Sequence, residues 1–75
     1  MNAVVVDTHT AIWYFLQSPK LSETARKTID SASKIYLSSI TIIEITYLTE
    51  KGRIPELALT RLINALNQVS SNWQL

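Results

Sequence analysis

The sequence predicts an α/β fold with a parallel sheet, and three observations support this prediction. Val4, Val5 and Val6 form an unbroken β-branched run, which is typical of a strand buried on both faces of a parallel sheet. Two helical patterns follow this run, and a second strand with two more helical patterns comes after them. Parallel strands joined by crossover helices are the arrangement that this order favours.

Local signals mark the strand and the two helices at the start of the chain. Thr8 or Thr10 is suited to cap the first helix, and Pro19 prevents that helix from continuing. Ser22 is a favourable N-cap for the second helix, whose apolar face includes Ile29. We expect these three elements over 3–6, 10–16 and 23–32.

The rest of the chain repeats the pattern of a strand and two helices. The strand around Ile35 ends in small polar residues. Gly52 suits the left-handed residue that ends the third helix, and Pro55 suits the first turn of the fourth. Trp73 lies where a third strand is expected to begin, so the sheet is expected to be incomplete. We expect these four elements over 35–38, 41–51, 56–69 and 72–75.

Composition excludes several classes of protein. The chain has 75 residues, enough for one small domain, and its hydrophobic content of 47% argues against disorder. A formal net charge of +1 does not by itself indicate a nucleic-acid-binding surface. The lack of cysteine excludes a disulfide framework. Asp7 and His9 interrupt the apolar start, which argues against a signal peptide, and no stretch is long enough for a membrane helix. We therefore expect a soluble, cytoplasmic protein.

Two carboxylates stand at unusual places in this pattern. Asp7 follows the first strand directly, and ligand sites in parallel sheets lie beyond the carboxyl ends of strands. A cap on the next helix explains Asp7 equally well. Glu44 lies within an isoleucine-rich helix, where a carboxylate is costly unless it is paired or binds a cation. The alternative for Glu44 is a capping box with Thr41.

Together the two carboxylates suggest a hard cation. Mg²⁺ or Mn²⁺ takes oxygen ligands, and one or two carboxylates with a substrate phosphate can hold it. Such a cation can orient water for attack on a phosphodiester. His9 is the only histidine, so a histidine-based metal site is not expected.

Three stretches, VVVDTHTAIWYF, LSETARKTI and IYLSSITIIEITYLTEKGRI, resemble the first half of a PIN domain. More narrowly, they resemble the VapC-type toxins of bacterial toxin–antitoxin pairs. The resemblance implies a three-layer α/β/α fold and a metal-dependent endoribonuclease that hydrolyses RNA phosphodiester bonds. It implies Asp7 and Glu44 as catalytic metal ligands for Mg²⁺ or Mn²⁺. It places the Thr8 hydroxyl beside the site, where it can bond a metal ligand or phosphate.

The resemblance also implies what this chain lacks. The family's remaining acids lie in the second half of the domain, and this chain has no acidic residue after Glu56. Residues 1–75 are therefore expected to form a partial PIN domain, truncated after about the first half and inactive alone. RNA would be the substrate of a complete domain. A cognate antitoxin is expected to cover the apolar helices, and a homodimer is the other partner considered.

Two interpretations from other classes stay open. The chain could be a non-catalytic interaction module that binds an antitoxin or a second copy through apolar helices, or it could be a non-functional remnant. The aromatic run Trp13, Tyr14 and Phe15 is more typical of a core or interface than of RNA stacking. Lys51 and Arg53 are the better candidates among the basic residues for a phosphate contact.

Overall fold

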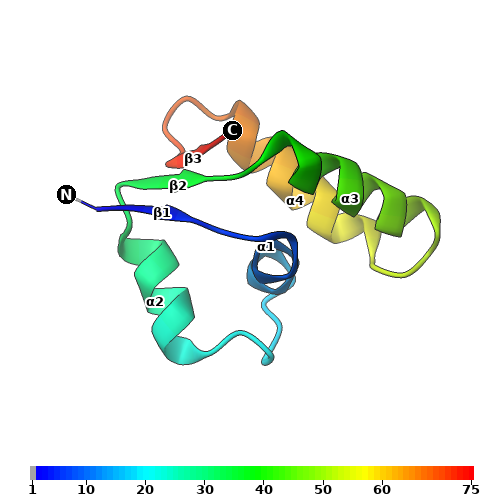
Figure 1. The fold of residues 1–75 in the computed structure, drawn as a ribbon, viewed down its shortest axis with the longest axis horizontal. Coiled ribbons are helices and arrows are strands. Elements are labelled where there is room, and N and C mark those ends of the chain that lie inside the picture. Colours follow the sequence, from blue (N-terminus) through cyan, green and yellow to red (C-terminus); the bar gives the residue numbers. More distant parts are fainter. Residues whose placement is uncertain (1) are drawn as a thin grey trace.

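A three-stranded parallel sheet packed against helices forms the described part of the chain, residues 2–75 of a computed structural model (Figure 1). The α/β class and the parallel sheet are thus confirmed. None of the described helices is long and apolar enough to cross a membrane. The elements in chain order are β1 (Ala3–Val5), α1 (Thr8–Phe15), α2 (Glu23–Ser31), β2 (Lys34–Tyr36), α3 (Ser39–Glu50), α4 (Glu56–Asn67) and β3 (Trp73–Gln74).

The sheet has the strand order β1-β2-β3, and only one of its faces is covered by helices. Val4 pairs with Ile35, and Ile35 pairs with Trp73, so these three side chains point toward the helices. Val5 and Tyr36 point the other way and are 80% and 37% exposed. Figure 1 shows α1 and α2 on one side of the strands, below β1 in this view. The expectation that the valine strand is buried on both faces is wrong, because no helix within residues 2–75 covers the second face.

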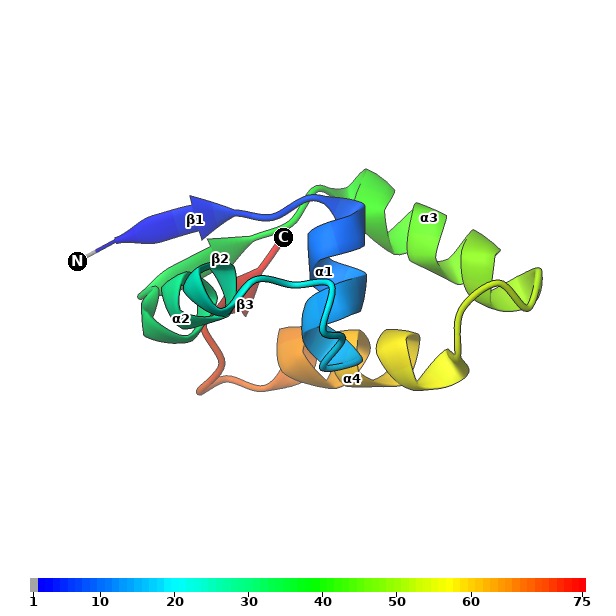
Figure 2. The same cartoon turned by 90° about the horizontal axis from the view of Figure 1, so that it is seen from below.

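Helix α1 forms the centre of the core. It contacts both α3 and α4, and Figure 2 shows it between the strands and α3. Ala11 on this helix is fully buried, which lets the neighbouring helices approach closely. Ile45 of α3 and Leu62 of α4 are the largest side chains that are completely enclosed among the described residues. The packing of α3 and α4 on α1 therefore holds the end of the sheet where the candidate site lies.

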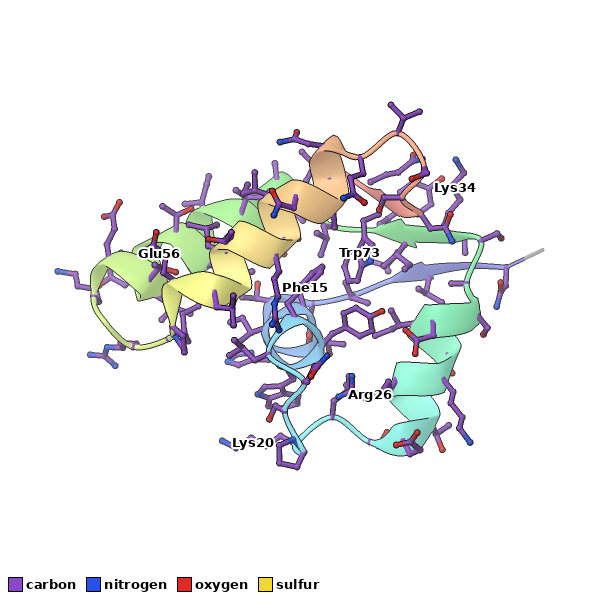
Figure 3. The ribbon with its side chains drawn as sticks, turned by 180° about the vertical axis from the view of Figure 1, so that it is seen from behind. Phe15, Lys20, Arg26, Lys34, Glu56 and Trp73 are labelled. Carbon is purple, nitrogen blue, oxygen red and sulfur yellow. The ribbon has the colours of Figure 1, made fainter. Side chains whose placement is uncertain are left out.

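An aromatic cluster ties α1 to the last strand. The rings of Phe15 and Trp73 are 4.6 Å apart and point toward each other (Figure 3). Tyr14 contacts both, with ring distances of 5.3 Å to Phe15 and 5.4 Å to Trp73. Such tilted and edge-on pairs stabilise a core beyond the area that they bury. Tyr14 and Phe15 thus serve the core.

Several element boundaries differ from the expected ones because a different residue makes the cap. Asp7, rather than Thr8 or Thr10, caps α1, so this helix begins two residues early. Its end follows from Gln17, which adopts a positive φ of 54°. Ser38 caps α3 through the Ile40 amide at 3.2 Å, so α3 begins at Ser39 and not at 41.

Other differences lie at the ends of elements. Gln68 is extended and ends α4 at Asn67, before the expected 69, so Val69 lies outside the helix and is fully exposed. The chain leaves the helix there because it must turn back to pair β3 with β2. The remaining strands and α2 differ from their expected ranges by one or two residues, as is usual for frayed ends. Gly52 has the left-handed φ of 69° that its position predicts.

The Tyr14 hydroxyl provides a pH-dependent contact between α1 and α2. It donates a hydrogen bond to Asp30 at 2.5 Å, and burial together with this bond raises the pKa of Tyr14 to about 12. The folded state therefore keeps this proton after the unfolded chain has lost its own near pH 10, so stability falls as pH rises from about 10 to 12. We expect Tyr14→Phe to flatten this part of the pH profile, as measured by urea unfolding at pH 8 to 12. An equally steep loss in the variant would show that another group controls it.

Candidate metal centre

The carboxyl ends of β1 and β2 lie side by side, and each strand leads directly into a helix. The Val6 amide donates to the Tyr36 carbonyl at 3.1 Å, which continues the pairing one residue past β1. Asp7 then caps α1, and Ser38 caps α3. Two capped helix N-termini are therefore brought to the same edge of the sheet, where ligand sites of parallel sheets are found.

Asp7 combines a structural bond with an exposed carboxylate. Its backbone is extended, with φ −86° and ψ 175°, and its Oδ1 accepts the Thr10 amide at 2.8 Å. Hydrogen bonds from the side chain and the backbone of Thr10 lower the pKa of the Asp7 carboxyl below its ordinary value, and the charge of His9 adds to this effect. Asp7 is thus ionised at neutral pH. The cap explains its place in the sequence, and its exposure leaves the same carboxylate facing solvent at the strand end.

Glu44 on α3 is held by a residue of α1. Its Oε1 accepts a hydrogen bond from the Thr8 hydroxyl on α1. The capping-box interpretation of Glu44 is wrong, because α3 begins at Ser39 and Glu44 lies beyond its first turn. The amide of Thr41 donates instead to the Ser38 carbonyl at 3.0 Å. The hydrogen bond from Thr8 on α1 therefore accounts for Glu44, a carboxylate in an otherwise apolar part of α3.

An open depression of about 420 Å³ brings the predicted site residues together. It contains Asp7, Thr8 and Glu44, which come from the α1 N-terminus and from α3. The full lining consists of Val5, Val6, Asp7, Thr8, Ser38, Ile40, Thr41 and Glu44. Lys51 and Arg53 are not part of it, and the Lys51 ammonium lies 5.6 Å from the centre of the Tyr47 ring. His9 is also outside the depression, with its ring 6.1 Å from that of Trp13.

Sequence reasoning missed two hydroxyl residues of this depression. The sequence predicts Ser38 as the end of a strand and Thr41 as a helix cap, whereas both line the depression. The spacing of Thr41 and Glu44, three residues apart, puts both on one helix face and could have indicated their proximity. The contact of Thr41 with Thr8 has no such signal, because 33 residues separate them.

The donor atoms in the depression fit a hard divalent cation. They are two carboxylates and the hydroxyls of Thr8, Ser38 and Thr41, all of them oxygen, which suits Mg²⁺ or Mn²⁺ better than Zn²⁺ or Cu²⁺. Within residues 2–75, no group of three or more His, Cys, Asp and Glu residues is arranged to hold a metal. Among the described residues, Asp7 and Glu44 are the only carboxylates that line the depression.

Comparisons with known proteins identify the family of the chain. The model of the PIN domain matches residues 4–74. The chain is 32% identical over 54 residues to the ribonuclease VapC22 of Mycobacterium tuberculosis (strain ATCC 25618 / H37Rv). That match covers 72% of this chain and 42% of the relative, so the chain spans less than half the length of the relative. No solved structure matches the chain significantly. The match over nearly all described residues shows that the chain belongs to the PIN domain family.

Proposed function

We propose that the chain forms the first part of a metal-dependent endoribonuclease site of the VapC toxin type, with RNA phosphodiesters as substrate. The observation that supports this most is the meeting of Asp7 and Glu44 in one depression at the carboxyl edge of a parallel sheet. These residues lie in separate elements, and only the fold unites them. The similarity to a ribonuclease of the VapC group supports the choice of RNA.

Asp7, Glu44 and Thr8 would form the working part of the depression. Asp7 and Glu44 hold Mg²⁺ or Mn²⁺ through carboxylate oxygens. The cation supplies Lewis acidity, which neutralises charge on the phosphodiester oxygens. Thr8 orients Glu44 through its hydroxyl. The N-termini of α1 and α3 add partial positive charge beside the depression, which favours a phosphate group there.

We propose further that the 75 residues alone cleave RNA little or not at all. Two carboxylates bind Mg²⁺ weakly, because this cation gives up its hydration water reluctantly. The depression is also open, so water is not excluded from it. The chain is therefore expected to bind a divalent cation without positioning the phosphodiester and the attacking water together.

A cleavage assay with a measured metal affinity tests both parts of this proposal. Mn²⁺ binding is followed by isothermal titration, and cleavage of a fluorescent single-stranded RNA is followed at saturating Mn²⁺. We expect saturable binding by the chain and no cleavage above that of Asp7→Asn. An absence of Mn²⁺ binding would overturn the metal site. Mn²⁺-dependent cleavage that Asp7→Asn abolishes would confirm the ribonuclease and overturn the proposed inactivity of the chain alone.

A second candidate function, protein binding, has its own observation. Ile40, Ile43 and Tyr47 on α3 are 61%, 67% and 57% exposed, although the opposite face of this helix is already in the core. A helix that is apolar on both sides usually has a partner on each. An antitoxin or a second copy would cover this face.

Sedimentation at rising concentration tests whether the chain associates with itself. A dimer that Ile43→Asp dissociates would support self-association. A monomer at all concentrations would exclude the second copy as the partner.

A further inference from the structure

We propose that Thr41 is a positioning residue that holds Glu44 in place through the hydroxyl of Thr8. This inference rests on the proposed metal-binding role of Glu44. It concerns a residue whose hydroxyl is hydrogen-bonded to Thr8 rather than to the carboxylate, and which lies in the wall of the depression. The contacts run from Thr41 on α3 to Thr8 on α1, and from Thr8 to Glu44 on α3.

The number of protons on the two hydroxyls determines the direction of these contacts. The Thr8 oxygen lies 3.4 Å from the Thr41 oxygen, and Thr8 is also bonded to Glu44 Oε1. A hydroxyl has one proton and two acceptor positions. Because a carboxylate can only accept, Thr8 gives its proton to Glu44. The Thr8 oxygen is then free to accept the proton of Thr41.

Because Thr41 is buried, it is the residue with the most fixed position in this series of contacts. Thr41 is only 4% exposed. Among residues 2–75 it is the only polar residue that is buried. A buried hydroxyl is costly without a partner, so Thr41 favours the Thr8 rotamer that provides one. Its branched side chain also has few rotamers inside a helix. Glu44 is exposed and has a long, flexible side chain, so its position depends on the groups that hold it.

Two other threonines of α3 show that this arrangement is specific to Thr41. The hydroxyls of Thr46 and Thr49 donate to the carbonyls four residues earlier, Ile42 and Ile45, each at 2.8 Å. These bonds stay within the helix, as is common for threonine. The Thr41 hydroxyl instead contacts a residue of another helix. Thr46→Val is therefore a matched control, because it removes the same group from the same helix away from the depression.

The experiment compares Thr41→Val, Thr41→Ser and Thr46→Val in the full chain. Valine keeps the shape of threonine and removes the hydroxyl, whereas serine keeps the hydroxyl and removes the methyl group. We expect Thr41→Val to weaken Mn²⁺ binding by about 10-fold, as for other residues that orient a metal ligand. We expect Thr41→Ser to keep the affinity but to lower the melting temperature. Thr46→Val should leave the affinity unchanged.

A metal-free measurement separates this inference from the metal site itself. The Hα–Hβ coupling of Thr8, measured by NMR, reports whether its side chain keeps one rotamer. We expect one rotamer in the wild type and in Thr41→Ser, and averaging in Thr41→Val. If the wild type does not bind Mn²⁺, the proposed function fails, and the Thr8 coupling still decides the role of Thr41. An unchanged coupling in Thr41→Val, or equal loss of affinity in Thr41→Ser, would overturn the inference.

Discussion

Asp7→Asn is expected to abolish the stabilisation of the chain by Mn²⁺ and to leave the metal-free fold intact. Asparagine keeps the side-chain oxygen that accepts the Thr10 amide, and it is among the best N-cap residues. It removes the negative charge, however, and a neutral amide is a poor ligand for a hard cation. This variant therefore separates the capping role of Asp7 from its proposed metal-binding role.

The expected shift is large enough to measure by thermal unfolding. A ligand at 100 times its Kd stabilises the folded state by about 2.7 kcal/mol. For a domain of this size, that corresponds to roughly 10–20 °C in the melting temperature. We expect this shift in the wild type and none in Asp7→Asn at neutral pH, where the lowered pKa keeps Asp7 charged.

Two further variants complete this test. Glu50→Gln removes an exposed carboxylate from the same helix as Glu44, outside the depression, and should keep the full response to Mn²⁺. Asp7→Ala also removes the cap, so it should lose about 1 kcal/mol of stability even without metal. A normal Mn²⁺ shift in Asp7→Asn would show that the cation binds elsewhere.

Leu62→Ala is expected to lower the free energy of unfolding more than any other single truncation considered for this chain. Leu62 is fully buried in α4, where this helix packs on α1 and α3. The loss of such a side chain costs about 2–5 kcal/mol, because a cavity remains. A domain of this length has roughly 4–11 kcal/mol of total stability, at the usual value per residue. The substitution therefore removes roughly half of the stability when the middle of each range is taken.

Leu57→Ala on the same helix is the matched control for this effect. Leu57 is 47% exposed, so its truncation should cost less than about 1 kcal/mol. Urea unfolding followed by circular dichroism gives both values. If the two variants lost the same stability, α4 would not pack against the core through Leu62.

Much of the architecture follows from local signals in the sequence. Ser22 and Gly52 occupy the cap positions that their chemistry favours, because each satisfies the helix end through its own backbone or side chain. The alternation of strand and helix patterns favours the parallel sheet, since the helices carry the chain back to the end of the sheet where each strand begins. The family could also be inferred from sequence, because Asp7, Thr8 and Glu44 stand in short, recognisable motifs.

The cap of α1 shows the limit of local reasoning. Thr8, Thr10 and Asp7 are all good N-cap residues, and the choice among them depends on the direction in which the chain leaves β1. The bond from Val6 to Tyr36 fixes this direction, and it depends on a strand that is 30 residues away. The same holds for α4. It ends two residues before its expected end, and the chain then turns back to pair β3 with β2.

The sequence by itself determined the α/β class, the order of the elements and the two carboxylates of the candidate site. Only the tertiary structure decided that Thr8 bonds Glu44, that Thr41 lies buried behind them, and that one face of the sheet is bare within residues 2–75. The physical reason is the range of the interactions. Caps and helix periodicity act over three or four residues, whereas the depression forms where segments more than 30 residues apart pack together.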